Sequence, residues 1–251
     1  MKRVLAVVAV VALVLAAVPC RADVTITMTR SAKAAYATME LSLVTYLKGM
    51  KSRMDLKGAG QDMSIFVDYA AKLQLMVNNV TKEIRTLDPS AGAADMPVNA
   101  GVPSASFEPL NQTKDILGRT CTGYMLRVSE PMKVGEETFT VTISGPVWMT
   151  KDGPDVAEWM AFEKATAAAG ISMSSLGQGL QAQATAEAQK RIAEKGVPLE
   201  REMQTKIEGT GPRAQRMAQR ANPTITEKVT AISTDPISDD VFAVPAGYTK
   251  K

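Results

Sequence analysis

Residues 154–195 are the one long segment with helical periodicity, and strand-like sequence lies on both sides of it. Pro154 and Asp155 are typical of a helix start, because proline suits the first helical position and an acid suits the first turn. Gly196 and Pro198 mark the end of the segment. Its second half is rich in alanine, and an isolated helix of this length is marginal in water. The segment therefore predicts two helices that cover a sheet.

The flanking sequence predicts that sheet. Residues 38–48 alternate between apolar and polar side chains, as in a half-buried antiparallel strand. Turn signals recur at short intervals on both sides of the helical segment, which is typical of an antiparallel meander. Because the helices have no core without the strands, we expect one α+β domain over residues 23–251.

Two segments interrupt this pattern. Residues 88–109 contain four prolines among Ala, Gly and Ser, with no consistent period, and predict a long flexible loop. Residues 210–219 are basic and are also predicted to be a loop.

The first 22 residues predict a signal peptide that is removed. Two basic residues precede the apolar run 4–18, and Cys20 and Ala22 occupy positions −3 and −1 of a cut before Asp23. The apolar run is short for a membrane span, which needs about 20 apolar residues. Nothing later in the sequence is apolar for long enough, so we expect no transmembrane segment in the mature chain and a periplasmic location.

Cys20 leaves a second interpretation open, in which the cysteine is acylated and anchors the chain to a membrane. Pro19 and Arg21 argue against it, because small residues are usual at those positions. If Cys20 leaves with the signal peptide, Cys121 is the only remaining cysteine, and no internal disulfide can form.

Charge and composition restrict the function. Removing the three basic residues of the signal peptide leaves 26 Lys and Arg against 26 Asp and Glu, so we expect no nucleic-acid partner. The chain contains no histidine, which excludes the usual Ser-His-Asp and Cys-His systems and histidine-ligated metal sites. It also lacks a phosphate-binding loop. We therefore predict no catalytic residue, no metal and no cofactor.

A basic cluster has two interpretations. Lys48, Lys51, Arg53 and Lys57 surround the first predicted hairpin. They could contact anionic lipid headgroups or another envelope component. Alternatively, they form a charged edge that prevents aggregation between strands, which we favour because acidic residues flank them.

Apolar stripes on the strands and helices would meet if the helices cover the concave side of the sheet. They form either a filled core or a lipophilic groove, and frequent methionine favours an adaptable surface. The candidate groove residues are Met39, Leu41, Leu43, Leu47, Trp148, Trp159, Met160, Leu176 and Leu180.

Several short motifs together resemble a known family. They are residues 48–54 (KGMKSRM), 116–121 (ILGRTC), 147–152 (VWMTKD) and 242–248 (FAVPAGY), with residues 197–200 (VPLE) after the helices. The chain resembles bacterial exported proteins of the domain-of-unknown-function 4412 type, which are related to the outer-membrane lipoprotein carrier LolA. This resemblance implies a strongly curved antiparallel sheet, a half-open β-barrel, with helices on its concave face.

The resemblance and the apolar stripes together predict a non-enzymatic periplasmic protein. It would bind a lipid or a lipoprotein acyl chain between sheet and helices, with the outer membrane or an envelope protein as a further partner. The alternative is a structural or interaction protein of the cell envelope with a packed core and no ligand.

Overall fold

The computed structural model describes residues 23–33, 37–87, 101, 104–134, 136–168, 194–220 and 223–251. These residues form one sheet of 12 strands in the order β12-β6-β5-β4-β3-β2-β1-β11-β10-β9-β8-β7. Neighbouring strands are antiparallel except β12, which runs parallel to β6. The strands are β1 (Val24–Lys33), β2 (Thr38–Lys48), β3 (Lys51–Gly58), β4 (Gln61–Asp68), β5 (Leu73–Asn78), β6 (Glu83–Thr86), β7 (Ser104–Ile116), β8 (Arg119–Val134), β9 (Glu137–Thr150), β10 (Val197–Gly209), β11 (Thr224–Ser233) and β12 (Thr249–Lys250).

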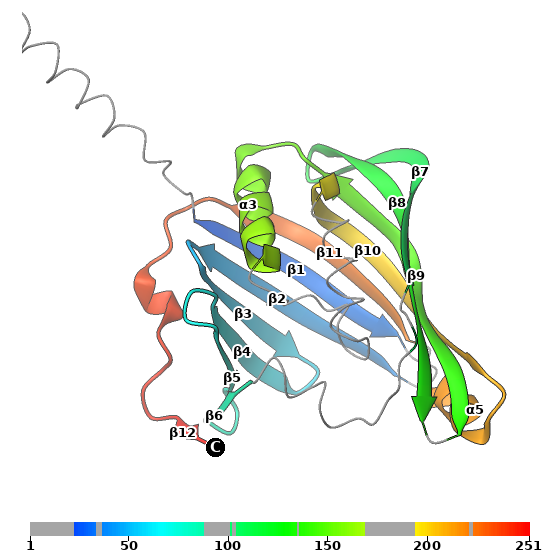
Figure 1. Ribbon diagram of the computed structural model, residues 1–251. Coiled ribbons are helices and arrows are strands. Elements are labelled where there is room, and N and C mark those ends of the chain that lie inside the picture. Colours follow the sequence, from blue (N-terminus) through cyan, green and yellow to red (C-terminus); the bar gives the residue numbers. More distant parts are fainter. Residues whose placement is uncertain are drawn as a thin grey trace, which may run out of the picture.

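The sheet is open and curved, as Figure 1 shows. The strands β1 to β5 form one wall, and the long strands β7 to β9 form the other. Helix α3 (Pro154–Ala168) lies on the concave side between the walls and packs against β1 and β10. The predicted antiparallel sheet with a helix on its concave side is therefore confirmed for the described residues.

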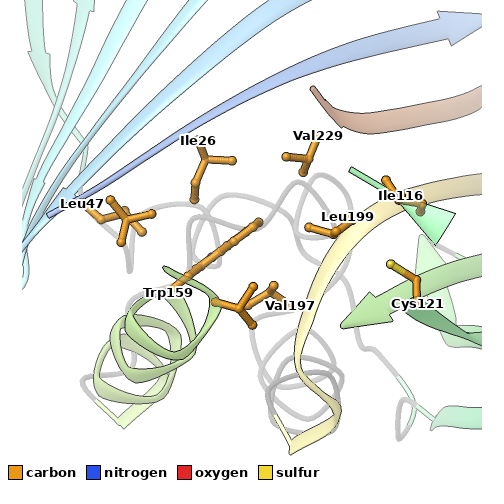
Figure 2. Packing of buried hydrophobic residues seen from close by; sticks show 10 residues of the cluster. Ile26, Leu47, Ile116, Cys121, Trp159, Val197, Leu199 and Val229 are labelled. Atoms are coloured by element: carbon orange, nitrogen blue, oxygen red, sulfur yellow. The ribbon is translucent and has the colours of Figure 1, made fainter. Parts of the chain in front are cut away.

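The main core forms where α3 meets the sheet (Figure 2). Trp159 points from the helix toward Ile26 and Leu47 on one side and toward Val197 and Leu199 on the other. These side chains are buried, and they come from strands that are far apart in the sequence. Burying a side chain of this size stabilises the fold by roughly 1.5–3 kcal/mol, so Trp159 is a major link between helix and sheet.

The helical prediction over residues 154–195 is tested only at its two ends. Helix α3 begins at Pro154 as expected, after Gly153 in a positive-φ conformation (φ 110°). Residues 194 and 195 are helical, and Gly196 ends that segment with φ 122°. The second predicted helix, with Leu176 and Leu180, lies at residues outside those that the structure describes.

A second helix is present where the sequence predicted a loop. Residues 212–220 form α5 (Pro212–Arg220), which packs on β10 and β9. Ala214, Met217 and Ala218 lie against a cluster that contains Phe139 and Ile207. The loop prediction was wrong because it relied on the basic composition of the segment and overlooked that Ala214, Met217 and Ala218 have the helical spacing i, i+3 and i+4.

The predicted loop 88–109 is wrong at its end. Residues 104–109 belong to β7, which pairs with β8 and leaves its other edge without a partner strand among the described residues. Pro109 fits there because proline is tolerated on edge strands and beside bulges, and the register shifts directly after it. A two-residue turn with positive φ at Leu117 and Gly118 then leads into β8.

The C-terminal residues cover the convex face of β3 to β6. We call residues 234–251 the C-terminal strap; it includes a short 3₁₀ helix, η2 (Asp239–Phe242). Val244 and Tyr248 pack on Phe66, Val77 and Ile84, which point away from α3. Within the described residues, no helix is long and apolar enough to cross a membrane.

Candidate functional site

The candidate groove residues divide between two clusters. Trp159, Leu47, Trp148 and Met160 belong to the core around α3. Leu41 and Leu43 lie farther along β2, in a second cluster with Leu56. Met39 is 40% exposed near the start of β2. Leu176 and Leu180 lie outside the described residues, so only the other seven candidate groove residues have a place in the structure.

Two apolar surfaces extend on the concave face beyond the contacts of α3 with β1 and β10. The first, the methionine belt, lies on β1 to β4 and consists of Leu41, Leu43, Leu56, Met28, Met54 and Ile65. The second, the aromatic belt, lies on β7 to β10 and consists of Leu126, Val128, Val147, Met149, Met203, Ala105, Phe107, Tyr124 and Ile143. In each belt the outer side chains are only partly buried. Sequence reasoning found Leu41 and Leu43 in the first belt but missed the second.

The aromatic belt has an ordered geometry. Phe107 of β7 stacks on Tyr124 of β8, with 4.6 Å between the ring centroids and 11° between the ring planes. Val147 and Met149 of β9 continue the same surface toward Met203 of β10. Such flat rings and flexible thioethers suit contact with ligands of variable shape.

A row of charged side chains separates the two belts. Arg30, Glu227 and Arg201 lie opposite one another on the adjacent strands β1, β11 and β10. Arg30 Nε donates a 2.6 Å hydrogen bond to Glu227 Oε1, and Arg201 Nε donates one to Glu227 Oε2. We call these three residues the ionic row.

The ionic row faces α3. On β1, Arg30 follows Ile26 and Met28 at every second residue, and Ile26 contacts the cluster around Trp159. The next residues along the row are Leu41 of the methionine belt, opposite Arg30, and Val147 of the aromatic belt, opposite Arg201. The two arginines hold the pKa of Glu227 below its ordinary value, against the effect of burial, so the carboxylate is ionised.

Helix α3 contributes one more acid to this region. Trp159 Nε1 donates a 3.1 Å hydrogen bond to Glu163 Oε1. Glu163 keeps access to solvent, but protein encloses it on enough sides that desolvation raises the pKa of its carboxyl. The hydrogen bond from Trp159 and the charge of Arg201 oppose that rise only in part.

Tyr69, which follows β4, packs against Phe162 of α3. Its ring meets Phe162 edge to face, with 5.3 Å between the centroids. Burial raises the pKa of Tyr69 to about 12, so its hydroxyl is neutral and interacts with Ser52. The sequence showed neither this contact nor the ionic row, because each joins residues that are distant in the chain.

An ion pair links the start of α3 to β8. Arg119 Nη2 of β8 lies 2.5 Å from Asp155 Oδ2 in the first turn of the helix. The carboxylate also favours the positive end of the helix dipole. This ion pair fixes the position of α3 over the concave face.

Two residues of the basic cluster at the first hairpin form hydrogen bonds with the C-terminal strap. Lys48 Nζ donates a 2.5 Å hydrogen bond to the carbonyl oxygen of Ile237, and Arg53 Nη1 donates a 2.9 Å bond to that of Val241. Lys48 also pairs with Asp239 at 3.0 Å, which holds the pKa of that carboxyl below its ordinary value. Of the four predicted basic residues, Lys48 and Arg53 thus bind the strap, and Lys57 pairs with Asp62 of β4 at 3.7 Å.

Within the described residues, no group of three or more Cys, Asp and Glu residues has the arrangement of a metal site. Cys121 is buried, and burial raises the pKa of its thiol, so it packs as a small apolar side chain.

Comparisons with known proteins give no family. No family model matches the chain, and no curated protein sequence does. The resemblance to the domain-of-unknown-function 4412 type therefore remains a prediction.

Among solved structures, the chain is similar to an uncharacterized conserved protein from Thermus thermophilus, with 6% identity, a TM-score of 0.43, and coverage of 92% of this chain and 91% of the other. It is also similar to a domain named for outer membrane lipoprotein sorting from Vibrio parahaemolyticus, with 8% identity, a TM-score of 0.36, and coverage of 89% and 90%. A third match, to PNGF-II, has 13% identity and a TM-score of 0.34; it covers 92% of this chain but only 31% of PNGF-II. Similarity at this level does not assign the chain to a family.

Proposed function

We propose that this protein is a non-enzymatic carrier of an amphiphile, either a lipid or the acyl chain of a lipoprotein, on the concave face of its sheet. The observation that carries the proposal is the pair of apolar belts on either side of the ionic row. Their outer side chains, among them Met54 and Phe107, are only partly buried by the described residues. Burying such surface under an acyl chain stabilises a complex by about 25 cal/mol per Å² of apolar area.

The composition of the belts also favours an acyl chain. Met28 and Met54 are unbranched and adapt to irregular ligands, and the Phe107–Tyr124 stack offers a flat apolar surface. A helix held at its start by Arg119 and Asp155 would then cover the bound chain.

Native mass spectrometry after gentle purification tests the proposal, together with titration of an uncharged fluorescent monoacylglycerol. We expect a bound lipid mass and saturable uptake of the probe. The protein would be a structural or interaction protein with a packed core if it were recovered ligand-free and did not take up the probe.

A matched pair of methionine variants locates the site. Met54→Glu places a charge in the methionine belt, whereas Met125→Glu places one on the opposite face of β8, where Met125 is already exposed. We expect Met54→Glu to weaken uptake by about tenfold, because the lost apolar contact and the buried charge both oppose binding. Met125→Glu should bind as the unchanged protein does.

The proposal includes export to the periplasm after removal of residues 1–22. N-terminal sequencing of the protein from a fractionated bacterial cell tests this. We expect a periplasmic product that begins at Asp23, whereas an acylated product beginning at Cys20 would support the lipid-anchored alternative.

A further inference from the structure

The C-terminal strap lies on a part of the sheet whose strands pair without it. Strands β2 to β6 are joined by continuous antiparallel ladders, whereas the strap adds only the two residues of β12, which pair with Glu83 and Ile84 of β6. We call the convex residues beneath the strap the strap face; they are Arg53, Phe66, Leu75, Val77 and Ile84. The strap therefore binds to a surface whose backbone pairing it does not supply.

Burial is unequal on the two sides of this contact. On the strap face, Phe66, Val77 and Ile84 are 6%, 0% and 6% exposed, and strap residues pack on all three. Of the 18 strap residues, only Ile237 is buried, 4 are partly buried and 13 are exposed. The strap thus resembles a bound peptide, which contacts its receptor through a few anchor side chains and keeps the rest in water.

The strap is also held through its main chain. Near its start, the Ile237 amide donates a 2.6 Å hydrogen bond to Asp23 Oδ2. Farther along, the Val241 carbonyl accepts a 2.9 Å bond from Arg53 Nη1, and at the end the Lys251 amide donates a 2.9 Å bond to a carbonyl oxygen of β6. Main-chain bonds spread over the whole segment fix an extended peptide in one register, while the apolar anchors select its sequence.

A short exposed hinge joins the strap to the sheet. Strand β11 ends at Ser233, and the next three residues, Thr234, Asp235 and Pro236, are exposed. Proline disfavours a helical backbone at the residue before it, so Pro236 favours an extended hinge. The strap can therefore leave its own face with β12 as the only strand that is lost.

We propose that the strap face is a docking surface for the strap of a second copy of this chain. The partner is argued from fit, because the strap of another copy presents the same anchors in the same order. Reciprocal exchange closes a two-fold dimer in which each copy covers the strap face of the other, and no further surface has to be buried. The strap face is convex, so exchange leaves both concave faces to a ligand, and the inference does not depend on the proposed function.

Protein concentration sets the balance between the closed chain and the exchanged dimer. A segment on a short linker has an effective concentration on the order of mM at its own binding face. The attached strap therefore outcompetes a second copy in dilute solution, and exchange becomes extensive as the protein itself approaches that concentration. Weakening the anchors of a chain's own strap frees its face at much lower concentrations.

The ion pair between Lys251 and Glu83 reports which copy supplies the strap. Nζ of Lys251 lies 2.5 Å from Oε1 of Glu83, so a carbodiimide can join them as an amide, with the lost water taken up by the reagent. Equal amounts of ¹⁵N-labelled and unlabelled protein are mixed, incubated, cross-linked and digested. A cross-linked peptide pair with one labelled and one unlabelled half arises only by exchange. We expect the fraction of such mixed pairs to rise at least tenfold between about 1 µM and about 1 mM protein.

A strap peptide tests the strap face directly. The opened variant, which is the full chain with Val244→Asp and Tyr248→Ala, lacks two apolar anchors of its own strap but keeps the strap face. We expect a fluorescent peptide of residues 234–251 to bind the opened variant at a concentration about tenfold or more below that needed for the unchanged protein. The same peptide with both substitutions is the matched control and should not bind.

Mixed pairs that do not increase with protein concentration would overturn the inference. A dimer with only unmixed pairs would overturn it as well, because its interface would lie elsewhere, and so would a strap peptide that binds no better than its control. Cross-linking uses the unchanged protein and decides the question even if the opened variant does not fold. Uptake of the fluorescent monoacylglycerol bears on the proposed function alone, since the strap face lies on the opposite side of the sheet.

Discussion

Trp159 and Glu163 lie one helical turn apart on α3, and the indole Nε1 of Trp159 donates a 3.1 Å hydrogen bond to Oε1 of Glu163. The bond joins the largest side chain of the core to an acid whose charge interacts with that of Arg201. Any change in the charge of Glu163 therefore acts directly on the contact between helix and sheet.

The raised pKa of Glu163 makes stability depend on pH in a definite direction. Its folded-state pKa lies above the ordinary value of 4.5, so the folded protein holds this proton more tightly than the unfolded chain does. The stabilisation from neutral Glu163 is fully present below about pH 4.5 and is lost as the pH rises through the folded-state pKa. In urea unfolding, Glu163→Gln should therefore gain stability over the unchanged protein as the pH increases from 4.5 upward.

Tryptophan fluorescence gives an independent measurement of the same titration. The chain contains 2 tryptophans, so in a Trp148→Phe background Trp159 is the only one. Its emission should change with a midpoint above 4.5, and this transition should vanish when Glu163→Gln is added. A midpoint at or below 4.5 would contradict the assignment.

The ion pair that fixes α3 predicts a strong effect of a single substitution. Asp155 is only 9% exposed, so Arg119→Met leaves a nearly buried carboxylate without its 2.5 Å partner. We expect a loss of about 2 kcal/mol or more in the free energy of unfolding, because an uncompensated buried charge is costly. Combining Arg119→Met with Asp155→Asn should restore part of the loss, and purely additive losses would show that the pair does not couple.

The C-terminal strap depends on a side chain from β3. Arg53 donates a 2.9 Å hydrogen bond to the carbonyl oxygen of Val241, and its guanidinium lies 5.1 Å from the centre of the Phe66 ring. Arg53→Ala should cost about 1–2 kcal/mol and make the chain sensitive to proteases after residue 233. Lys57→Ala is the control, since the exposed Lys57 pairs with Asp62 at only 3.7 Å and its loss should change stability by less than about 0.5 kcal/mol.

Features with local periodicity could be predicted from the sequence. The alternation around Leu41 and Leu43 gave the strand β2, and Pro154 marked the start of α3, because each pattern reflects neighbours in the chain. The apolar stripe on β2 also named Leu41 and Leu43 as candidate groove residues, and both lie in the methionine belt. The helical cover was predicted from residues 154–195, whereas the curvature of the sheet entered only through the resemblance.

The ionic row could not be predicted, since Arg30 and Glu227 are 197 residues apart in the chain. Its members meet only because β1 pairs with β11, a strand from the opposite end of the sequence. The strap has the same origin, for Lys48 and Ile237 are 189 residues apart. Composition alone assigned Lys48 and Arg53 to an exposed cluster, whereas the fold supplies them with carbonyl partners in the strap.

Helix α5 provides the last prediction, because its position rests on one small side chain. Ala214 is 1% exposed, and its Cβ lies close to Gly209 on β10 and within the cluster of Phe139, Val141 and Ile207. A longer side chain does not fit there without moving the helix. Ala214→Glu should therefore lower the free energy of unfolding by about 2 kcal/mol or more, since it adds both volume and a buried charge.

The neighbouring residue supplies the control for this measurement. Gln215→Glu adds the same charge to the same helix at an exposed position, so its effect should stay within about 0.5 kcal/mol. Urea unfolding followed by circular dichroism compares the two variants. Helix α5 lies apart from the ionic row. If the Ala214→Glu variant still folds in the absence of urea, it should therefore take up the fluorescent monoacylglycerol as the unchanged protein does. Equal stability of the two variants would contradict the packing of Ala214 against β9 and β10.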